Sequence, residues 1–181
     1  EASYTNKLLE VNQDWIDDAV GDLFKQFDKE NGGFGFTDGN PNRPKFPEPS
    51  NLVLLLEVLR INKEENVAKE MLLTSLDRMA MGGIRDHFGG GFHRYSVDRF
   101  WRIPHFEKML YDNAQLVSVY ASAYQLFPQD EYRLGFDELL TFVSAELTSP
   151  EGGFYSALDA ESEDEEGKYY RWTRAQIEEI V

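Results

Sequence analysis

Apolar residues recur every three or four positions through long segments of the chain, the spacing that places them on one face of an α-helix. In the first such segment, Trp15, Ala19 and Leu23 follow one another at intervals of four. Ser50 is expected to cap the second helix, and Thr173 with Gln176 forms a capping box at the start of the last. The pattern predicts helices over residues 12–28, 50–61, 63–81, 104–127 and 130–147 and from 173 onward.

Long polar segments separate these helices, and three of them open with two adjacent glycines: Gly32–Gly33, Gly82–Gly83 and Gly152–Gly153. Because the helices follow one another in pairs, we expect the three glycine-led loops to lie at the same end of the molecule. The fold class predicted is all-α, with short β-hairpins in the loops.

Two loop regions show strand-like patterns. Residues 91–95 and 99–103 flank a short turn and predict one hairpin. Residues 154–157 and 168–172 read as strands on either side of an acidic run, which is expected to form a solvated turn.

Helical hairpins arranged in a ring bury an inner layer of helices and leave their loops to form a cleft. Six helices are half of a ring of six hairpins, an (α/α)6 toroid. The chain begins with Glu1 rather than Met and stops within a predicted helix at Val181. We therefore expect residues 1–181 to be one domain that is a fragment of such a toroid. An incomplete ring exposes apolar surface, which predicts a homodimer or a poorly soluble monomer in isolation.

Composition narrows the range of functions. The net charge of −15 argues against nucleic acid and anionic membrane surfaces as partners, because both require a basic face. The chain has no cysteine, which excludes disulfides, thiol catalysis and zinc–thiolate sites. No stretch approaches the roughly 20 apolar residues of a membrane span. A cytoplasmic location is the expectation.

The segment 81–113 contains all three histidines of the chain, interleaved with aromatic and charged residues and five glycines. A loop of this length in a compact domain is usually functional. The residues predicted to be catalytic are His105, His87, His93, Asp86 and Asp112. The residues predicted to bind substrate are Arg94, Tyr95, Trp101, Arg102, Lys108, Tyr111, Asp159 and Lys45.

His105, Lys108 and Asp112 are spaced to share one face at the start of the predicted fourth helix. One interpretation is a base, a cation and a carboxylate that face the cleft near a helix N-terminus. The alternative is a solvent-exposed Lys–Asp pair beside a histidine bonded to a loop carbonyl.

Asp86 beside His87 is either an acid–base pair or a tie within the loop. No motif with metal-ligand spacing is present, so neither a metal nor another cofactor is predicted. The acidic run lacks the glycine and terminal glutamate of an EF-hand, and Asp159 is the better candidate for the cleft. The aromatic residues suit sugar stacking, although core packing is their commoner use.

Three motifs carry a resemblance to a known family: KFP at 45–47, the long match GGIRDHFGGGFHRYSVDRFWRIPHFEKMLYDNAQL at 82–116, and GGFYSALDAESE with EGKYYRWT within 152–173. The chain resembles the thioredoxin-domain-containing family typified by spermatogenesis-associated protein 20. The resemblance implies a thioredoxin-like domain followed by an (α/α)6 toroid similar to six-hairpin glycosidases and N-acylglucosamine 2-epimerases. This chain would be the first half of that toroid. No catalytic residue is assigned by the resemblance.

Two classes of function remain open. The first is an enzyme acting on a small carbohydrate, either by proton transfer beside a sugar carbonyl with histidine as base or by glycoside hydrolysis with a pair such as Asp86 and Asp159. The second is a non-catalytic module that binds a sugar or a partner and serves the thioredoxin-like domain. The histidines of the long loop favour epimerase-like or isomerase-like chemistry.

Overall fold

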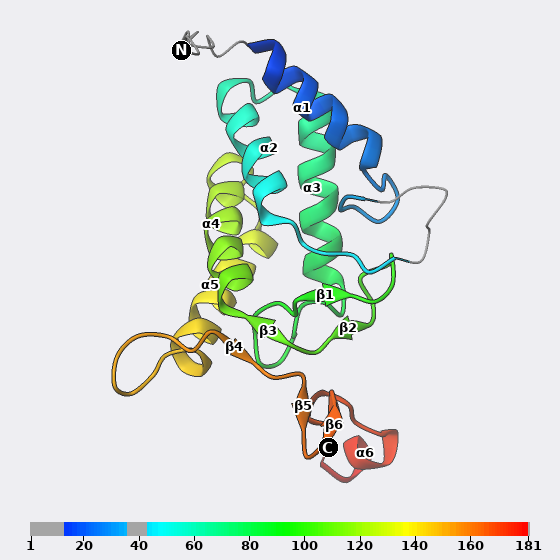
Figure 1. Ribbon diagram of the computed structural model, residues 1–181, viewed down its shortest axis with the longest axis vertical. Coiled ribbons are helices and arrows are strands. Elements are labelled where there is room, and N and C mark those ends of the chain that lie inside the picture. The colour runs from blue at the N-terminus through cyan, green and yellow to red at the C-terminus, as the bar shows by residue number, and fades with distance from the viewer. Residues whose placement is uncertain (1–12, 36–42, 181) are drawn as a thin grey trace, which may run out of the picture.

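The computed structural model describes residues 13–35 and 43–180, and in these residues helices account for most of the regular structure. α3 packs against α1, α2 and α5, and α4 packs against α2 and α5 (Figure 1). This gives a layer containing α2 and α4 against a layer containing α1, α3 and α5. The helices are α1 (Gln13–Gln26), α2 (Pro49–Ile61), α3 (Asn66–Met81), α4 (Leu110–Leu126), α5 (Asp130–Glu146) and α6 (Arg174–Ile180).

The apolar stripes predicted from the sequence meet between the two layers. Leu52 and Leu59 of α2, Leu72 of α3, and Leu116 and Tyr120 of α4 are completely buried. Burying a side chain of this size stabilises the fold by roughly 1.5–3 kcal/mol. The all-α prediction is confirmed, and the helix layers fix where the loops emerge.

The three glycine-led loops lie at one end of the molecule, as predicted. α2 and α4 begin at the lower end in Figure 1, and α3 and α5 end there. The loop after α1 reaches the same end, where the backbone of Lys45 pairs with that of Ser96. The loop after α5 joins it through pairing between Lys108 and Leu158. Segments far apart in the sequence therefore meet in one loop layer.

Short antiparallel strands tie this loop layer together. β1 (Tyr95–Ser96) pairs with β2 (Pro104–His105), and β3 (Lys108–Met109) pairs with β4 (Ala157–Leu158). β5 (Glu161–Ser162) and β6 (Glu165–Glu166) form a third hairpin, with an exposed turn at Glu163 and Asp164, and a single 3₁₀ turn, η1 (Lys168–Tyr170), follows.

The predicted start of the fourth helix at Pro104 is wrong. α4 begins six residues later, at Leu110, because residues 104–105 and 108–109 pair with other strands. His105 and Lys108 therefore do not share a helix face with Asp112. The hairpin predicted for 91–95 and 99–103 is also displaced, since its paired residues are 95–96 and 104–105. The strand predicted for 168–172 is wrong, because residues 168–170 form η1.

The helix starts are partly as predicted. Thr173 and Gln176 form the expected capping box: the Thr173 N–H donates to Gln176 Oε1 at 2.8 Å, and the Gln176 N–H donates to Thr173 Oγ1 at 3.3 Å. α2 begins at Pro49 rather than after Ser50, because the proline ring already has helical φ. α3 begins later than predicted, where the Glu65 side chain accepts hydrogen bonds from two backbone N–H groups.

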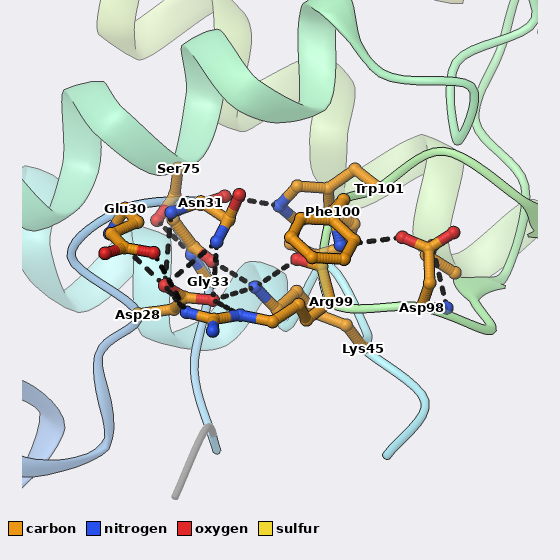
Figure 2. Close-up of polar contacts among 12 residues, drawn as sticks. Asp28, Glu30, Asn31, Gly33, Lys45, Ser75, Asp98, Arg99, Phe100 and Trp101 are labelled. Atoms are coloured by element: carbon orange, nitrogen blue, oxygen red, sulfur yellow. Dashed lines mark hydrogen bonds and ion pairs between the residues drawn. The ribbon is translucent and has the colours of Figure 1, made fainter. Parts of the chain in front are cut away.

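A buried ion cluster of Asp28, Lys45 and Arg99, here called the Asp28 cluster, joins three parts of the loop layer (Figure 2). Lys45 Nζ donates to Asp28 Oδ2 at 2.9 Å, to the Gly32 carbonyl at 2.7 Å and to the Arg99 carbonyl at 2.8 Å. The Arg99 guanidinium donates to both Asp28 oxygens, at 3.0 and 2.8 Å. Lys45 and Asp28 are 3% and 1% exposed, so the cluster belongs to the protein interior.

Trp101 is packed against this cluster and explains why glycine occupies two nearby positions. Its indole N–H donates to the Asn31 carbonyl at 2.7 Å, and its ring lies 5.1 Å from Lys45 Nζ. A Cβ at Gly33, where φ is +76°, would lie 2.6 Å from the Trp101 ring. A Cβ at Gly82 would lie 2.7 Å from both the Cβ and the carbonyl oxygen of Trp101. These glycine pairs allow the loops to approach one another closely.

The Asp28 cluster yields a test of stability. Lys45→Met removes the ammonium and leaves the Asp28 carboxylate in the interior with one cation fewer, which is expected to cost roughly 3–5 kcal/mol of unfolding free energy. Lys25→Met is the matched control, because Lys25 and its partner Asp22 are 76% and 69% exposed. The control is expected to change stability by less than about 1 kcal/mol. Urea denaturation measures both, and equal stabilities for the two variants would contradict the assignment.

Candidate functional site

A cavity of about 300 Å³ lies in the loop layer and brings together three residues predicted for the site. Asp86 comes from the loop after α3, Lys108 from β3 and Asp159 from the segment after β4. Apart from Gly89, which lies in the same loop as Asp86, the rest of the lining comes from the C-terminal part of α5 and from residues 158–170. The other lining residues are Gly89, Phe142, Glu146, Leu158, Ala160, Ser162, Tyr169 and Tyr170.

Lys108 and Asp86 form a buried ion pair on the cavity wall. Lys108 Nζ lies 2.7 Å from Asp86 Oδ2 and 2.8 Å from the Gly90 carbonyl oxygen. The other Asp86 oxygen accepts hydrogen bonds from the backbone N–H groups of Phe88 and Gly89 at 3.0 and 2.9 Å. The pair therefore closes the glycine-rich turn and holds it against β3.

Burial and pairing act in opposite directions on these two groups. Burial raises the pKa of Asp86, but the hydrogen bonds from Lys108 and from the backbone outweigh it and hold that pKa below its usual value. Burial lowers the pKa of Lys108 in spite of its pairing with Asp86. Asp86 is therefore ionised at neutral pH, which suits a base or a nucleophile and not a proton donor.

His93 is placed beside the cavity wall as a structural residue. Its Nδ1 lies 3.0 Å from the Phe106 carbonyl oxygen, and its ring meets the rings of Phe106 and Tyr170 edge-on at 5.4 and 5.0 Å. The ring is 2% exposed. Burial and the nearby Lys108 ammonium lower its pKa to about 4. His93 is neutral at pH 7 and is a weak base, so a catalytic role is not favoured by this geometry.

His105 lies in β2 and is oriented by a carboxylate 61 positions away in the sequence. Its ring stacks on Tyr95 at 4.8 Å, and Nδ1 lies 2.7 Å from Glu166 Oε1. Because a carboxylate accepts hydrogen bonds, Nδ1 carries a proton in this contact. Nε2 is then the nitrogen that exchanges protons with its surroundings, and it lies 3.9 Å from Glu107 Oε2. The side chain is 26% exposed, which leaves it within reach of a ligand.

Asp112 is a buried carboxyl in the first turn of α4. Asp112 Oδ2 and Arg94 Nε are the buried side-chain atoms of the described chain that have no hydrogen-bond partner. Arg94 instead uses Nη1 to bind Glu107 at 2.8 Å. Burial raises the pKa of Asp112 to about 6; Arg94 opposes this rise and Glu107 adds to it. A carboxyl group with this pKa retains a proton under mildly acidic conditions, as a proton donor requires.

The remaining predicted residues are distributed around the loop layer rather than gathered in the cavity. His87 Nε2 lies 3.0 Å from the Gly82 carbonyl oxygen, and Arg102 covers the ring of Phe100. Tyr111 is half exposed on α4. Lys45 and Trp101 are buried in and beside the Asp28 cluster, where they hold loops together and are not presented to a ligand.

Several residues of the site were not predicted from the sequence, chiefly Glu166, Tyr170 and Phe142. Glu166 was included in an acidic run expected to be solvated, and Phe142 in the apolar stripe of a helix. One available signal was Gly167, which follows the acidic run and has φ +69°. A Cβ there would collide with the Phe106 ring, so this glycine marks where residues 160–170 press onto the long loop.

Comparison with known proteins relates the chain to one family. Residues of the chain are 43% identical over 168 positions to spermatogenesis-associated protein 20 of Homo sapiens and equally to that of Mus musculus, a match that covers 88% of this chain. An uncharacterised protein of Caenorhabditis elegans is 36% identical over 167 positions, with 86% of this chain covered. This chain is a homologue of part of spermatogenesis-associated protein 20. It spans about one fifth of the length of these relatives, and no family model matches it.

Solved structures with the same fold are (α/α)6 enzymes. Cellobiose 2-epimerase from Bacillus thermoamylovorans superposes with a TM-score of 0.66 at 16% identity, covering 81% of this chain and 40% of the enzyme. D-mannose isomerase superposes with a TM-score of 0.57 at 16% identity, and the match covers 80% of this chain and 39% of the isomerase. A family 76 glycoside hydrolase from a Bacteroides thetaiotaomicron strain superposes with a TM-score of 0.55 at 17% identity, and the match covers 67% of this chain and 25% of the hydrolase. The predicted toroid-type fold is confirmed, and so is the resemblance to the spermatogenesis-associated protein 20 family.

The remaining expectations keep the status of predictions. These are the thioredoxin-like domain, the homodimer and the cytoplasmic location. Among residues 13–35 and 43–180, no helix is both long and apolar enough to cross a membrane.

The raised pKa of Asp112 predicts how a substitution changes stability with pH. An exposed aspartate titrates near pH 4, whereas Asp112 in the folded state titrates at about 6. The folded state therefore loses stability relative to the unfolded state as pH rises from about 4 to 6. Asp112→Asn, which has no charge to bury, is expected to be more stable than the wild type above pH 6.

The measurement is a series of urea denaturations between pH 4 and 8. The stabilising effect of Asp112→Asn should shrink as the pH falls toward 4. Asp130→Asn is the control, since Asp130 is 92% exposed and is expected to show little change at any pH. An Asp112→Asn variant that is destabilised most at pH 8 would contradict the interpretation.

Proposed function

We propose that this domain acts on a carbohydrate at its loop layer by proton transfer beside a sugar carbonyl, as an epimerase or isomerase does. The observation that carries the proposal is the contact between His105 and Glu166, which orients an imidazole at the edge of the loop layer. A carboxylate that accepts from one ring nitrogen fixes the tautomer and the orientation of the ring, and leaves the other nitrogen as the acceptor. His105 Nε2 is then the group that removes a proton from the carbon next to the sugar carbonyl.

The residues around His105 suit the step that follows proton removal, in which the enediolate is stabilised and protonated again. Glu107 lies near His105 Nε2 and also binds Arg94. The charge of Arg94 lowers the pKa of Asp112, and the charge of Glu107 raises it. Removal of the proton leaves an enediolate, in which negative charge has moved onto the former carbonyl oxygen. Arg94 supplies a positive charge near that position, and Asp112 is the group able to protonate oxygen or carbon. The names of the structural neighbours, which include sugar epimerases and an isomerase, favour this chemistry.

Proton exchange in D₂O tests the proposal directly. The full-length protein is incubated with aldoses and ketoses in D₂O, and NMR detects deuterium on the carbon next to the carbonyl. His105→Gln is expected to lower the exchange rate by roughly 10²- to 10⁴-fold, the usual contribution of a general base. Glu166→Gln should lower it less, because the imidazole remains while its orientation is lost. Glu163→Gln is the matched control: it lies in the same hairpin, 76% exposed, and should leave exchange unchanged.

Glycoside hydrolysis is the alternative with a structural observation in its favour. Asp86 and Asp159, the pair considered from the sequence, both line the 300 Å³ cavity. The ionised state of Asp86 suits the nucleophile or base of such a pair. Release of reducing sugar from a glycoside, with no deuterium exchange and with full activity in His105→Gln, would support hydrolysis and contradict the isomerase proposal. Sugar binding with neither reaction would support a non-catalytic module.

A further inference from the structure

The cavity lined by Lys108 and Asp159 has an unbalanced negative charge. Asp86, Glu146 and Asp159 contribute three carboxylates to its wall, and Lys108 contributes one ammonium. Asp86 is neutralised by Lys108 at 2.7 Å. Within the described residues, neither Glu146 nor Asp159 has a basic side chain within ion-pair distance, although Asp159 Oδ1 accepts a hydrogen bond from the Glu161 N–H at 3.1 Å. The lining therefore has a net charge of −2 at neutral pH.

Aromatic rings form another part of the cavity wall. Phe142 and Tyr170 lie with their ring centres 4.6 and 5.2 Å from Lys108 Nζ, so the wall already holds one alkylammonium group against ring faces. Tyr169 meets Tyr170 edge-on at 5.1 Å and is 73% exposed, which leaves a ring available to a ligand. Ring faces attract cations and also stack on the apolar faces of sugar rings. A volume of about 300 Å³ is at the small end of ligand pockets and suits a single sugar ring.

We propose that this cavity binds a sugar that carries a positively charged amino group. The sugar ring would stack on the exposed ring of Tyr169, and its ammonium group would lie toward Asp159 and Glu146, which have no basic side chain of the described chain within ion-pair distance. This inference rests on the proposed function, since it names the class of carbohydrate that the domain takes. It differs from that proposal because it concerns the cavity wall and not the His105 group.

Binding of three sugars of similar shape tests the inference. Calorimetry on the full-length protein compares glucosamine, which is cationic, with N-acetylglucosamine and glucose, which are neutral. Glucosamine is expected to bind at least tenfold more tightly than either neutral sugar in low salt. Because Glu146 and Asp159 are exposed to solvent, the preference should weaken as the salt concentration rises.

Substitution of Glu146 and Asp159 tests whether these two carboxylates cause the preference. The double variant Asp159→Asn/Glu146→Gln is expected to bind glucosamine no more tightly than glucose, while its circular dichroism stays unchanged. Asp130→Asn removes a carboxylate at the other end of α5 and should keep the full preference. Equal affinities for the three sugars in the wild type, or a preference that survives in the double variant, would overturn this inference and leave the proposed function standing. Absence of binding and exchange with every sugar, neutral or cationic, would overturn both.

Discussion

The loop layer depends on the Asp28 carboxylate, which is 1% exposed and binds two cations. Removing a carboxylate from water costs several kcal/mol, and the cost is offset only where the surrounding groups pair with it in good geometry. Lys45 and Arg99 come from two different loops, and backbone N–H groups of residues 30 and 31 complete the shell. The carboxylate therefore favours only those structures in which the end of α1, the segment before α2 and the long central loop meet.

The same arrangement recurs at the cavity, where it supports the site directly. Lys45 and Lys108 are 3% and 2% exposed, and each donates to one aspartate and to one glycine carbonyl. Lys45 also lies over the ring of Trp101, and Lys108 lies over the rings of Phe142 and Tyr170. The Lys45 contacts place the Trp101 segment and the β1–β2 hairpin that carries His105. The Lys108 contacts fix the glycine-rich turn and one wall of the cavity. Lysine and aspartate, residue types that suggest catalysis, thus hold the loops in place here. The solvent-accessible side chains of Asp159, Tyr169 and His105 are available to bind a ligand.

The helices and the gathering of the loops were predictable because both follow from local periodicity. α5 has the predicted extent to within one residue, and the glycine pairs correctly marked three loops of one layer. The start of α4 was not predictable from spacing, because Lys108 pairs with Leu158, 50 positions further on, and such pairing leaves no local pattern. For the same reason, the partner of His105 was missed: Glu166 reads as one of several solvated acids until the fold places it at 2.7 Å. Local patterns identify elements, whereas contacts between distant loops decide the site.

Native-state hydrogen exchange on the wild type and on Asp28→Asn tests most directly whether one buried carboxylate holds the loop layer together. In the wild type, the amides of Lys45, Ile84 and Ser96, which donate to backbone carbonyls of neighbouring loop segments, should be protected nearly as well as amides in the middle of α4. In Asp28→Asn these three amides should lose protection together while α4 remains protected. Fast exchange at these amides in the wild type, or a loss confined to the residues next to position 28, would contradict the account.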